Sequence, residues 1–243
     1  MAPSPLSTPV TIGDAPVSPV VSAAAAVDLD ELATVNERFS SRPASAVVAW
    51  AYDRFGSDLV LAASFQDCVL IDIVYRTVPD VEVVFLDTQY HFAETLWYVE
   101  QVKARYDINL NVIRPERSPD DLWHNDPDAC CRARKVEPMQ RALAGKAAWM
   151  SGLRRVESAA RAETPLVAWD ETRGMVKINP IAGWWDADVA GYIRDHDLPV
   201  HPLTERGYDS IGCWPCTRPV GQGEDARAGR WAGLDKTECG LHL

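Results

Sequence analysis

Asp58-Leu-Val-Leu-Ala-Ala63 is a short apolar run, and the polar segment Ser64-Phe-Gln-Asp67 follows it directly. An apolar run of this length between a glycine, Gly56, and a polar loop is typical of a strand buried on both faces of a parallel sheet. The next residues, from Val69 to about Thr77, have apolar spacing that predicts a helix. The strand, the loop and the helix together form the first repeat of an α/β fold.

The same pattern continues along the chain. Strands are predicted at Val81–Leu86 and near Asn109–Ile113, with a helix over about 92–106 between them, and a fourth strand at Ala147–Met150. Three consecutive strand–helix repeats predict a doubly wound, mostly parallel sheet. Four further helices are predicted: over 28–39, capped by Asp28; from 41 or 43 to 55; over 132–143; and over 186–195, capped by Asp186. A polar mobile loop is predicted over 156–164. A small hairpin or two edge strands are predicted at 166–169 and 176–178.

The composition suits one domain with an extension. The chain has 243 residues, of which 47% are hydrophobic, and residues 1–27 carry a single charge, Asp14. We expect a disordered tail over 1–27 and one domain over 28–243. The tail lacks a basic start before an apolar run, which argues against a signal peptide, and no window approaches the roughly 18 apolar residues of a membrane span. We therefore expect a cytoplasmic protein without a membrane partner.

The charge distribution points to a small ligand. The net charge is −11, and an overall acidic chain is a poor candidate for general nucleic-acid binding. The cations instead form local groups, which indicate a small anionic ligand or, equally, scattered solvated charges. These groups are Arg132–Lys135, Arg154–Arg155, Arg161 and Arg227–Arg230.

Three polar loops follow the predicted strands: Ser64–Asp67, Asp87–His91 and Ser151–Arg155. In an open parallel sheet, ligands bind where such loops lead from strands into helices. A serine-containing turn at a helix start offers N–H groups to a phosphate. Ser64–Asp67 lacks the glycines and lysine of a Walker loop, so on its own residues an ordinary capped turn is the commoner explanation.

Four cysteines form a candidate metal site. Cys130 and Cys131 are adjacent in Asp128–Lys135, and Cys213 and Cys216 lie 82 positions further on in a Cys-x-x-Cys spacing. In a reducing compartment such thiols are more often metal ligands or catalysts than disulfides. Zinc and iron–sulfur clusters both accept four thiolates, so the spacing cannot separate them. Buried thiols without a metal are the alternative.

Cys239 lies in the polar tail segment Lys236-Thr-Glu-Cys239-Gly-Leu-His242. The neighbouring Lys236 and His242 could lower the pKa of its thiol, and a flexible tail could move it between a substrate and a reductant. An incidental surface cysteine is the alternative. Other chemistry-bearing residues receive structural interpretations: Cys68 in the core, and His124, His196 and His201 structural or exposed. Trp231, beside Arg230, is a candidate for stacking on a ligand.

Taken together, these segments resemble the bacterial assimilatory adenylyl-sulfate (APS) reductases. The resemblance rests on Cys130-Cys131, on Gly212-Cys213-x-x-Cys216 and on Lys236–His242, and it extends to Leu86–Thr95, Gly152–Arg155 and Gly229–Trp231. It covers the chain from about residue 56 to the end, and the combination is far more specific than any single segment.

The resemblance implies a sheet related to the adenosine-nucleotide α-hydrolases and a [4Fe–4S] cluster on Cys130, Cys131, Cys213 and Cys216. It implies attack by Cys239 on APS, release of AMP, and release of sulfite by thioredoxin or a glutaredoxin-like dithiol, as a step of sulfate assimilation toward cysteine. A mobile catalytic tail would span about 217–243.

The resemblance also implies roles for polar residues. Lys135 would bridge the cluster region and the substrate sulfate, and Ser64 and Asp67 would contact the nucleotide. The anionic groups would be held by Arg154 or Arg155, by Arg227 and by Arg230, with Arg134 and His242 as weaker candidates. The chain departs from the family pattern in its short Ser64–Asp67 loop and in Gln89, where glycine is common.

Two alternatives remain open. A phosphoadenylyl-sulfate (PAPS) reductase, or an enzyme that uses both substrates, would share the tail, but PAPS reductases typically lack the four cluster cysteines. A zinc-stabilised nucleotide-binding sensor without turnover belongs to another class of protein, and such a sensor has no need for a nucleophile at Cys239. The sequence is compatible with a homo-oligomer.

Overall fold

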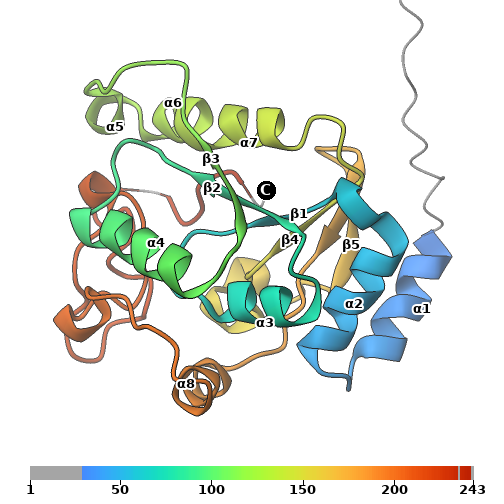
Figure 1. Cartoon of the computed structure of the whole chain (residues 1–243). Helices are drawn as coiled ribbons and strands as arrows, with labels where there is room; N and C mark the ends of the chain where they lie inside the picture. The colour runs from blue at the N-terminus through green and yellow to red at the C-terminus, as the bar shows by residue number, and fades with distance from the viewer. Residues whose placement is uncertain (1–28, 235, 242–243) are drawn as a thin grey trace, which may run out of the picture.

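A six-stranded sheet with the strand order β3-β2-β1-β4-β6-β5 forms the centre of the part of the chain that the structure describes (Figure 1). The structure is a computed structural model and describes residues 29–234 and 236–241, so the predictions on residues 1–27, Asp28 and His242 lie outside it. The strands are β1 (Leu59–Ala62), β2 (Glu82–Leu86), β3 (Asn109–Ile113), β4 (Ala148–Ser151), β5 (Val167–Asp170) and β6 (Met175–Ile178). Neighbouring strands are parallel, except that β5 pairs antiparallel with β6. The predicted fold class is confirmed.

The side chains of the central strands point alternately to the two faces of the sheet, so the core consists of two apolar clusters. In β1, Leu59 and Leu61 belong to the larger apolar cluster, whereas Val60 points to the smaller one on the other face. Trp149 of β4 joins Val60 in the smaller cluster. Side chains on a strand alternate between faces, so a continuous apolar run buries both faces of the sheet. This is why the short apolar strands could be recognised without an alternating pattern.

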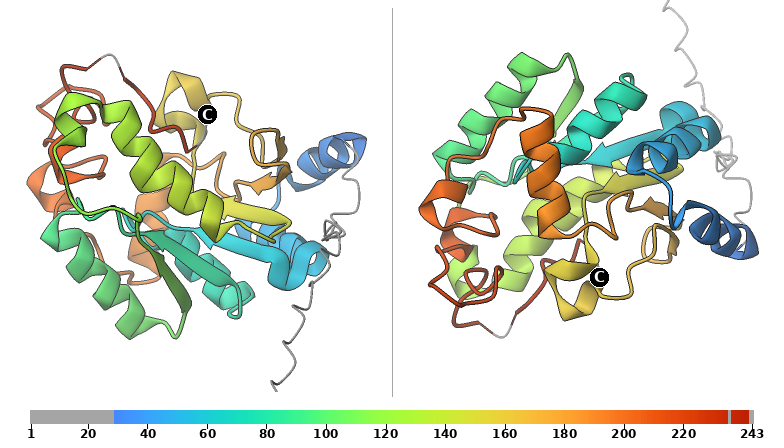
Figure 2. Two further views of the ribbon diagram at one scale, coloured as in Figure 1. Left: turned by 90° about the horizontal axis from the view of Figure 1, so that it is seen from above. Right: turned by 90° about the horizontal axis from the view of Figure 1, so that it is seen from below.

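Helices cover both faces (Figures 1 and 2). On the larger cluster lie α2, α3 and α4, with α8 against α3, while α1 packs on β5 at the edge. On the other face lies α7, which contributes Met139, Ala142 and Leu143 to the smaller cluster. The helices are α1 (Leu29–Phe39), α2 (Ala44–Phe55), α3 (Val69–Thr77), α4 (Ala93–Arg105), α5 (Leu122–Asn125), α6 (Pro127–Cys131), α7 (Glu137–Ala142) and α8 (Asp186–Asp195). No helix among these residues is long and apolar enough to cross a bilayer.

The predicted helix over 132–143 is wrong at its start. Helical structure begins at Pro127, and the side chain of Asp126 accepts a hydrogen bond from the N–H of Ala129. Between α6 and α7 lies a wider π-helical turn, Arg132–Val136, which carries Arg134 and Lys135. Such turns interrupt α-helices most often at functional sites, because the extra residue redirects the side chains.

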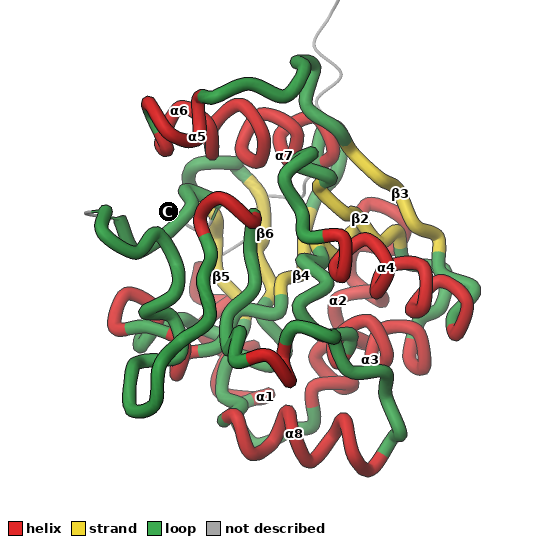
Figure 3. The backbone as a smooth tube through the Cα atoms, turned by 90° about the vertical axis from the view of Figure 1, so that its left-hand side faces the viewer, coloured by secondary structure: helices red, strands yellow, loops and turns green. Residues whose placement is uncertain are grey.

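The path of the chain creates a crevice between β1 and β4. From β1 the chain passes to β2 and β3 on one side, and then returns to β4 on the other side of β1. The loops after β1, β2 and β4 therefore meet at one edge of the sheet, where ligands bind in open α/β folds. The segment after α8 contains only short 3₁₀ turns among the described residues and gathers at this edge (Figure 3).

Candidate active site

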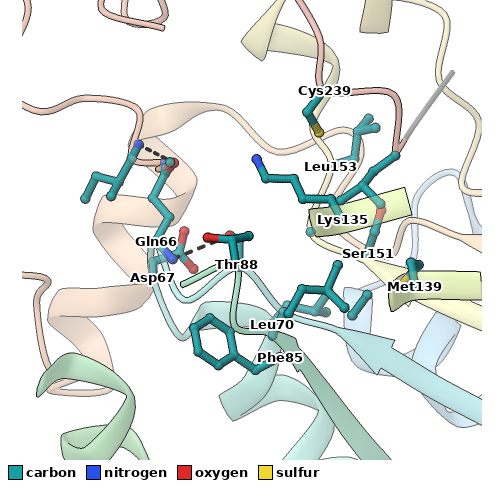
Figure 4. A pocket seen from close by; sticks show the side chains of 18 of the residues that line it. Gln66, Asp67, Leu70, Phe85, Thr88, Lys135, Met139, Ser151, Leu153 and Cys239 are labelled. Atoms are coloured by element: carbon teal, nitrogen blue, oxygen red, sulfur yellow. Dashed lines mark hydrogen bonds between the residues drawn. The ribbon is translucent and has the colours of Figure 1, made fainter. Parts of the chain in front are cut away.

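A cavity of about 220 Å³ lies at this edge of the sheet (Figure 4). Its walls come from the loops after β1, β2 and β4, from the π-helical turn and α7, and from the C-terminal segment. Among the predicted site residues, those that line it are Ser64, Asp67, Lys135, Cys213, Arg227, Arg230 and Cys239. Residues up to 175 positions apart in the chain, from Ser64 to Cys239, thus meet at one cavity.

Cys239 forms one end of the cavity, and the ammonium group of Lys135 points into the space between that thiol and the loop that contains Gln66 (Figure 4). Burial alone would raise the pKa of the Cys239 thiol. The charge of Lys135, the N–H of Leu241 and the charge of Arg230 outweigh that effect, so the pKa lies below its ordinary value. A lowered thiol pKa increases the fraction of thiolate, which is the nucleophilic form.

The ammonium group of Lys135 lies near the thiols of three cysteines. Burial alone would lower the pKa of its ammonium group, but the neighbouring Cys213, Cys239 and Cys131 favour the charged form, and the pKa is raised. Lys135 lines both this cavity and a second one that contains the four predicted ligand cysteines. A cation that lines both cavities would stabilise negative charge on the Cys239 thiol in one and on the predicted ligand cysteines in the other.

The guanidinium group of Arg230 contacts the backbone of Gly212 and the ring of Trp231. Its guanidinium carbon lies 4.5 Å from the centre of the Trp231 ring, and Nη1 donates a hydrogen bond to Ser210. A Cβ atom on Gly212 would lie 2.4 Å from Nη2, so only glycine leaves room for the guanidinium there. Nε of Arg230 is buried and has no hydrogen-bond partner within the described structure. The guanidinium is therefore available to an anion in the cavity, whereas Trp231 is 2% exposed and packs on Arg230.

The loop after β1 forms the side of the cavity opposite Cys239. The N–H of Gln66 donates to Ser64 Oγ, and Gln66 Oε1 accepts from the N–H of Ile211. Asp67 Oδ1 accepts a hydrogen bond from the N–H of Val69, the first residue of α3. Burial raises the pKa of Asp67 despite that hydrogen bond. The loop thus combines a helix start with hydroxyl and amide groups, a suitable contact for a ribose or phosphate.

Apolar side chains complete the cavity. Leu70 and Phe85 line its lower part in Figure 4, and Met139 and Leu153 lie on the right-hand side. Leu153 belongs to the predicted ligand loop Ser151–Arg155, whereas the other three were predicted only as helix or strand residues, because nothing in a local pattern distinguishes the wall of a pocket from the rest of the core. An apolar wall beside convergent polar groups is typical of small-molecule sites.

Arg154 and Arg155 do not line the cavity. Arg154 Nη1 donates to Asp186 at 2.8 Å, and Arg155 Nε donates to the carbonyl of Thr164 at 2.7 Å. Their guanidinium groups are thus engaged by neighbouring segments, and their role as substrate ligands stays a prediction. Arg134 is 1% exposed and lies over the ring of Tyr90, and its role as a weaker candidate for the anionic groups stays a prediction.

An ion network that the sequence did not indicate fixes the tail. The carboxylate of Glu238 accepts hydrogen bonds from Nε and Nη2 of Arg161, both at 2.7 Å, and lies 3.3 Å from Nη2 of Arg227. Burial would raise the pKa of Glu238, but Arg161 and Arg227 outweigh it and the pKa is lowered. The segment 156–164, predicted as a polar mobile loop, includes most of one 3₁₀ turn, Arg155–Glu157, and all of another, Ala159–Arg161. Arg161 in this segment is buried.

The four predicted ligand cysteines line one small cavity, together with Lys135, Trp123 and Trp231. Cys130 and Cys131 end α6, and Cys213 forms an isolated antiparallel bridge with His91. Thr88 Oγ1 lies 3.3 Å from Cys213 Sγ. Burial and the neighbouring thiols raise the pKa of Cys130 to about 11.

The four thiols around this cavity are a donor set that fits an iron–sulfur cluster, in which each thiolate binds a different iron, and four thiolates also suit zinc. No three His, Cys, Asp or Glu side chains among the described residues are grouped closely enough to hold a single ion.

The other cysteine and histidine interpretations agree with the structure. Cys68 is 1% exposed and belongs to the larger apolar cluster. His201 is buried, and its Nε2 lies 3.0 Å from Thr95 Oγ1. His124 is exposed, whereas His196 is half-buried and its ring stacks on that of Tyr192, with the ring centres 4.0 Å apart.

Comparison with known proteins identifies the family. Residues 58–219 match the family model of the phosphoadenosine phosphosulfate reductase domain. The chain belongs to this family. The adenosine 5'-phosphosulfate reductase of Mycobacteroides abscessus is 46% identical to it over 227 residues, which cover 88% of this chain and 96% of that protein. The adenosine 5'-phosphosulfate reductase of Streptomyces coelicolor is 48% identical over 204 residues, which cover 81% and 86%. The resemblance noted from the sequence is confirmed.

Solved structures show the same fold. The crystal structure of a PAPS reductase from Candida auris, a phosphate complex, superimposes with a TM-score of 0.72 at 30% identity and covers 79% of this chain and 98% of that one. A Candida glabrata FMN adenylyltransferase, with a TM-score of 0.56 at 13% identity, covers 80% and 69% and shares the fold alone.

Proposed function

We propose that this reductase-family chain reduces APS to sulfite and AMP through a thiosulfonate on Cys239. The observation that carries the proposal is the position of the Cys239 thiol and the Lys135 ammonium group at the same cavity, at the carboxyl edge of the sheet. The names of the relatives, which cover most of the chain, support APS as the substrate.

In the first step, the Cys239 thiolate attacks the sulfur of the sulfate group of APS. A bond forms between Sγ and that sulfur, and the bond from the sulfur to the bridging oxygen breaks. Both bonding electrons leave with AMP, whose phosphate is a good leaving group and needs no proton. The product on the enzyme is Cys–S–SO₃⁻, and the total charge is unchanged.

In the second step, a thiolate of an external dithiol attacks Sγ of Cys239 and releases sulfite. The second thiol of the reductant then displaces Cys239 and leaves a disulfide on the reductant. The substrate sulfur gains two electrons, and the dithiol supplies both. Thioredoxin or a glutaredoxin-like protein fits this role, which places the reaction in a reducing compartment such as the cytoplasm.

The cations of the cavity suit the charge that develops. Lys135 and Arg230 lie beside Cys239 and favour the thiolate. They also face the position of the sulfate, where negative charge shifts toward the bridging oxygen in the transition state. Fixed cations in a site of little water stabilise such charge more strongly than they would in solution. The loop Ser64–Asp67 and the apolar wall suit the adenosine part.

We further propose that Cys130, Cys131, Cys213 and Cys216 hold a [4Fe–4S] cluster. The donor set of four thiols around one cavity supports this assignment. When bound, such a cluster supplies a polarisable charged group beside Lys135. A redox role is not required, because the dithiol carries both electrons.

The decisive experiment is anaerobic incubation with APS in the absence of reductant, followed by intact mass measurement. A gain of one SO₃ on the peptide that contains Cys239, with release of AMP, is the expected result, and Cys239→Ser should show neither. PAPS in a parallel reaction tests the alternative substrate. If neither nucleotide forms an adduct although both bind, the chain is a binding protein without turnover, as the sensor hypothesis states.

A further inference from the structure

The tail segment, residues 236–241, is held by two ionic contacts just before Cys239. The first joins Lys236 to Asp128, which lies in α6 two positions before Cys130. The second joins Glu238 to Arg161 and Arg227. One contact leads to the cysteine region, and the contact with Arg161 leads to the loop after β4.

These contacts differ strongly in burial. The side chain of Glu238 is 5% exposed and that of Arg161 is 11% exposed, and two hydrogen bonds join them. Asp128, in contrast, is 77% exposed, and one ion pair joins it to Lys236. Exposed ion pairs contribute little free energy and are screened by salt, whereas a buried and hydrogen-bonded pair is costly to break. The Lys236–Asp128 contact is therefore the first to open.

Opening of the tail is a requirement of the proposed reaction. The sulfur of Cys239 lies inside a cavity of about 220 Å³, which is far too small to admit a protein dithiol. The same sulfur must face the cavity for attack on the nucleotide and must leave it for attack by the reductant. The population of the closed tail therefore affects the two half-reactions in opposite directions.

We propose that the Lys236–Asp128 pair is a clasp that sets this population, and that Asp128 is a positioning residue for Cys239. This inference rests on the proposed role of Cys239 as the nucleophile. Lys236 is suited to the task, because its side chain is 11% exposed and its ammonium group lies 5.6 Å from the centre of the buried Trp231 ring. Its position is thus defined, and Asp128 supplies the charge that holds it.

Cys239 alkylation in the resting protein tests the clasp. Anaerobically purified protein is treated without nucleotide with a maleimide carried on a neutral polyethylene glycol chain that is too large for the cavity, and modification of the Cys239 peptide is followed by mass spectrometry. A neutral reagent is chosen so that its approach does not depend on nearby charges. Asp128→Asn should raise the rate roughly twofold to fivefold, as expected for loss of a weak ion pair that favours the closed state. Lys236→Gln should give the same increase.

Two control variants distinguish the effect of the Lys236–Asp128 ion pair from a general effect of removing a charge. Asp121→Asn removes the same charge from an exposed position nearby and should leave the rate unchanged. The double variant Asp128→Lys with Lys236→Asp restores an ion pair of reversed sense and should return the rate toward that of the parent protein. The parent rate should also rise from low salt to roughly 0.5 M salt, and that of Asp128→Asn should not.

The inference is overturned if Asp128→Asn and Asp121→Asn give the same rate, or if the reversed pair reacts as fast as Asp128→Asn. Because the measurement contains no nucleotide, its result is independent of the substrate. A missing SO₃ adduct would instead count against the proposed function alone.

Discussion

The backbone of Gly212 lies directly against the guanidinium group of Arg230, so that a Cβ atom at position 212 would lie 2.4 Å from Nη2 and 2.6 Å from Cζ. Side chains do not approach so closely, and one of the two residues would have to move. Arg230 is the one that can, because the atoms in question are the far end of a flexible side chain. Gly212 thus determines where this cation lies in the cavity.

Gly212→Ala should therefore weaken nucleotide binding and leave the fold intact. Displacement of Arg230 removes a charged contact, and loss of such a contact costs roughly tenfold in affinity. Binding of AMP, sulfate and APS can be measured by calorimetry. Gly191→Ala is the matched control, since Gly191 lies in α8, where the nearest contact of a new Cβ is an ordinary 3.7 Å. Equal affinities of the two variants would contradict the assigned role of Arg230.

Lys135→Gln should shift the reactivity of Cys239 to higher pH. The pKa of this thiol lies below its ordinary value of 9.0, because Lys135 and other groups outweigh the effect of burial. Loss of the cation raises the pKa, so the midpoint of alkylation against pH moves upward and the rate at neutral pH falls, by about tenfold for each pKa unit. Lys103→Gln, on the exposed face of α4, serves as the control. An unchanged midpoint would show that Lys135 does not act on the thiol.

Cys213→Ser should lose iron. The variant removes one of the four thiols around the small cavity, and an iron–sulfur cluster depends on its full set of cysteine ligands. Iron, acid-labile sulfide and zinc can be determined together in protein purified without oxygen. Cys68→Ala should retain the parent iron content, because Cys68 lies in the apolar core. Iron unaffected by Cys213→Ser, or zinc in place of iron and sulfide, would refute the cluster.

Asp72→Asn should destabilise the fold in a pH-dependent manner. The carboxylate of Asp72 is fully buried and accepts hydrogen bonds from Arg76, Tyr106 and Tyr192. Burial alone would raise its pKa, but these donors outweigh burial, and the pKa lies below the ordinary value of 3.8. At neutral pH the variant should lose about 2 kcal/mol of free energy of unfolding, as is typical of hydrogen bonds to a charged group.

The sign of the pH dependence follows from the lowered pKa. The stabilisation by Asp72 is complete above the unfolded pKa and is lost as the pH falls through the folded pKa. The difference between parent and Asp72→Asn should thus be constant from neutral pH to about pH 4 and shrink below it. Urea unfolding at several pH values provides the measurement, with the exposed Asp53→Asn as the control. A difference that does not change at low pH would exclude this linkage.

The sheet could be predicted from local patterns because its strands are short apolar runs bounded by turns. Even the hairpin of β5 and β6 was predictable, and Gly174, with a φ of 63°, lies in its turn. Helix boundaries were less well predicted. Asp186 is the first residue of α8 and not its cap, and the side chain of Asp126 caps α6 before the expected start.

The cavity could be predicted only in part. Cys239 was recognisable from its setting in the tail, and Lys135 from the resemblance of its segment to the reductase family, and both line the cavity. The ion pair of Glu238 with Arg161 was not predictable, because the two residues lie 77 positions apart and no periodic pattern links them. The position of Arg154 likewise depends on Asp186, which a distant helix supplies. Contacts between distant segments result from tertiary packing and leave no trace in local spacing.

The short antiparallel bridge between His91 and Cys213 joins the loop after β2 to the Cys-x-x-Cys turn, and the N–H of Trp214 donates to the carbonyl of Tyr90 beside it. Thr88, in the same loop, lines the larger cavity and lies against Cys213 Sγ. The backbone thus links the cysteine region directly to the larger cavity, and we expect a disturbance of the one to reach the other. A copy damaged by oxygen at its cysteines should release its nucleotide as well as lose activity, and would not sequester substrate from intact copies.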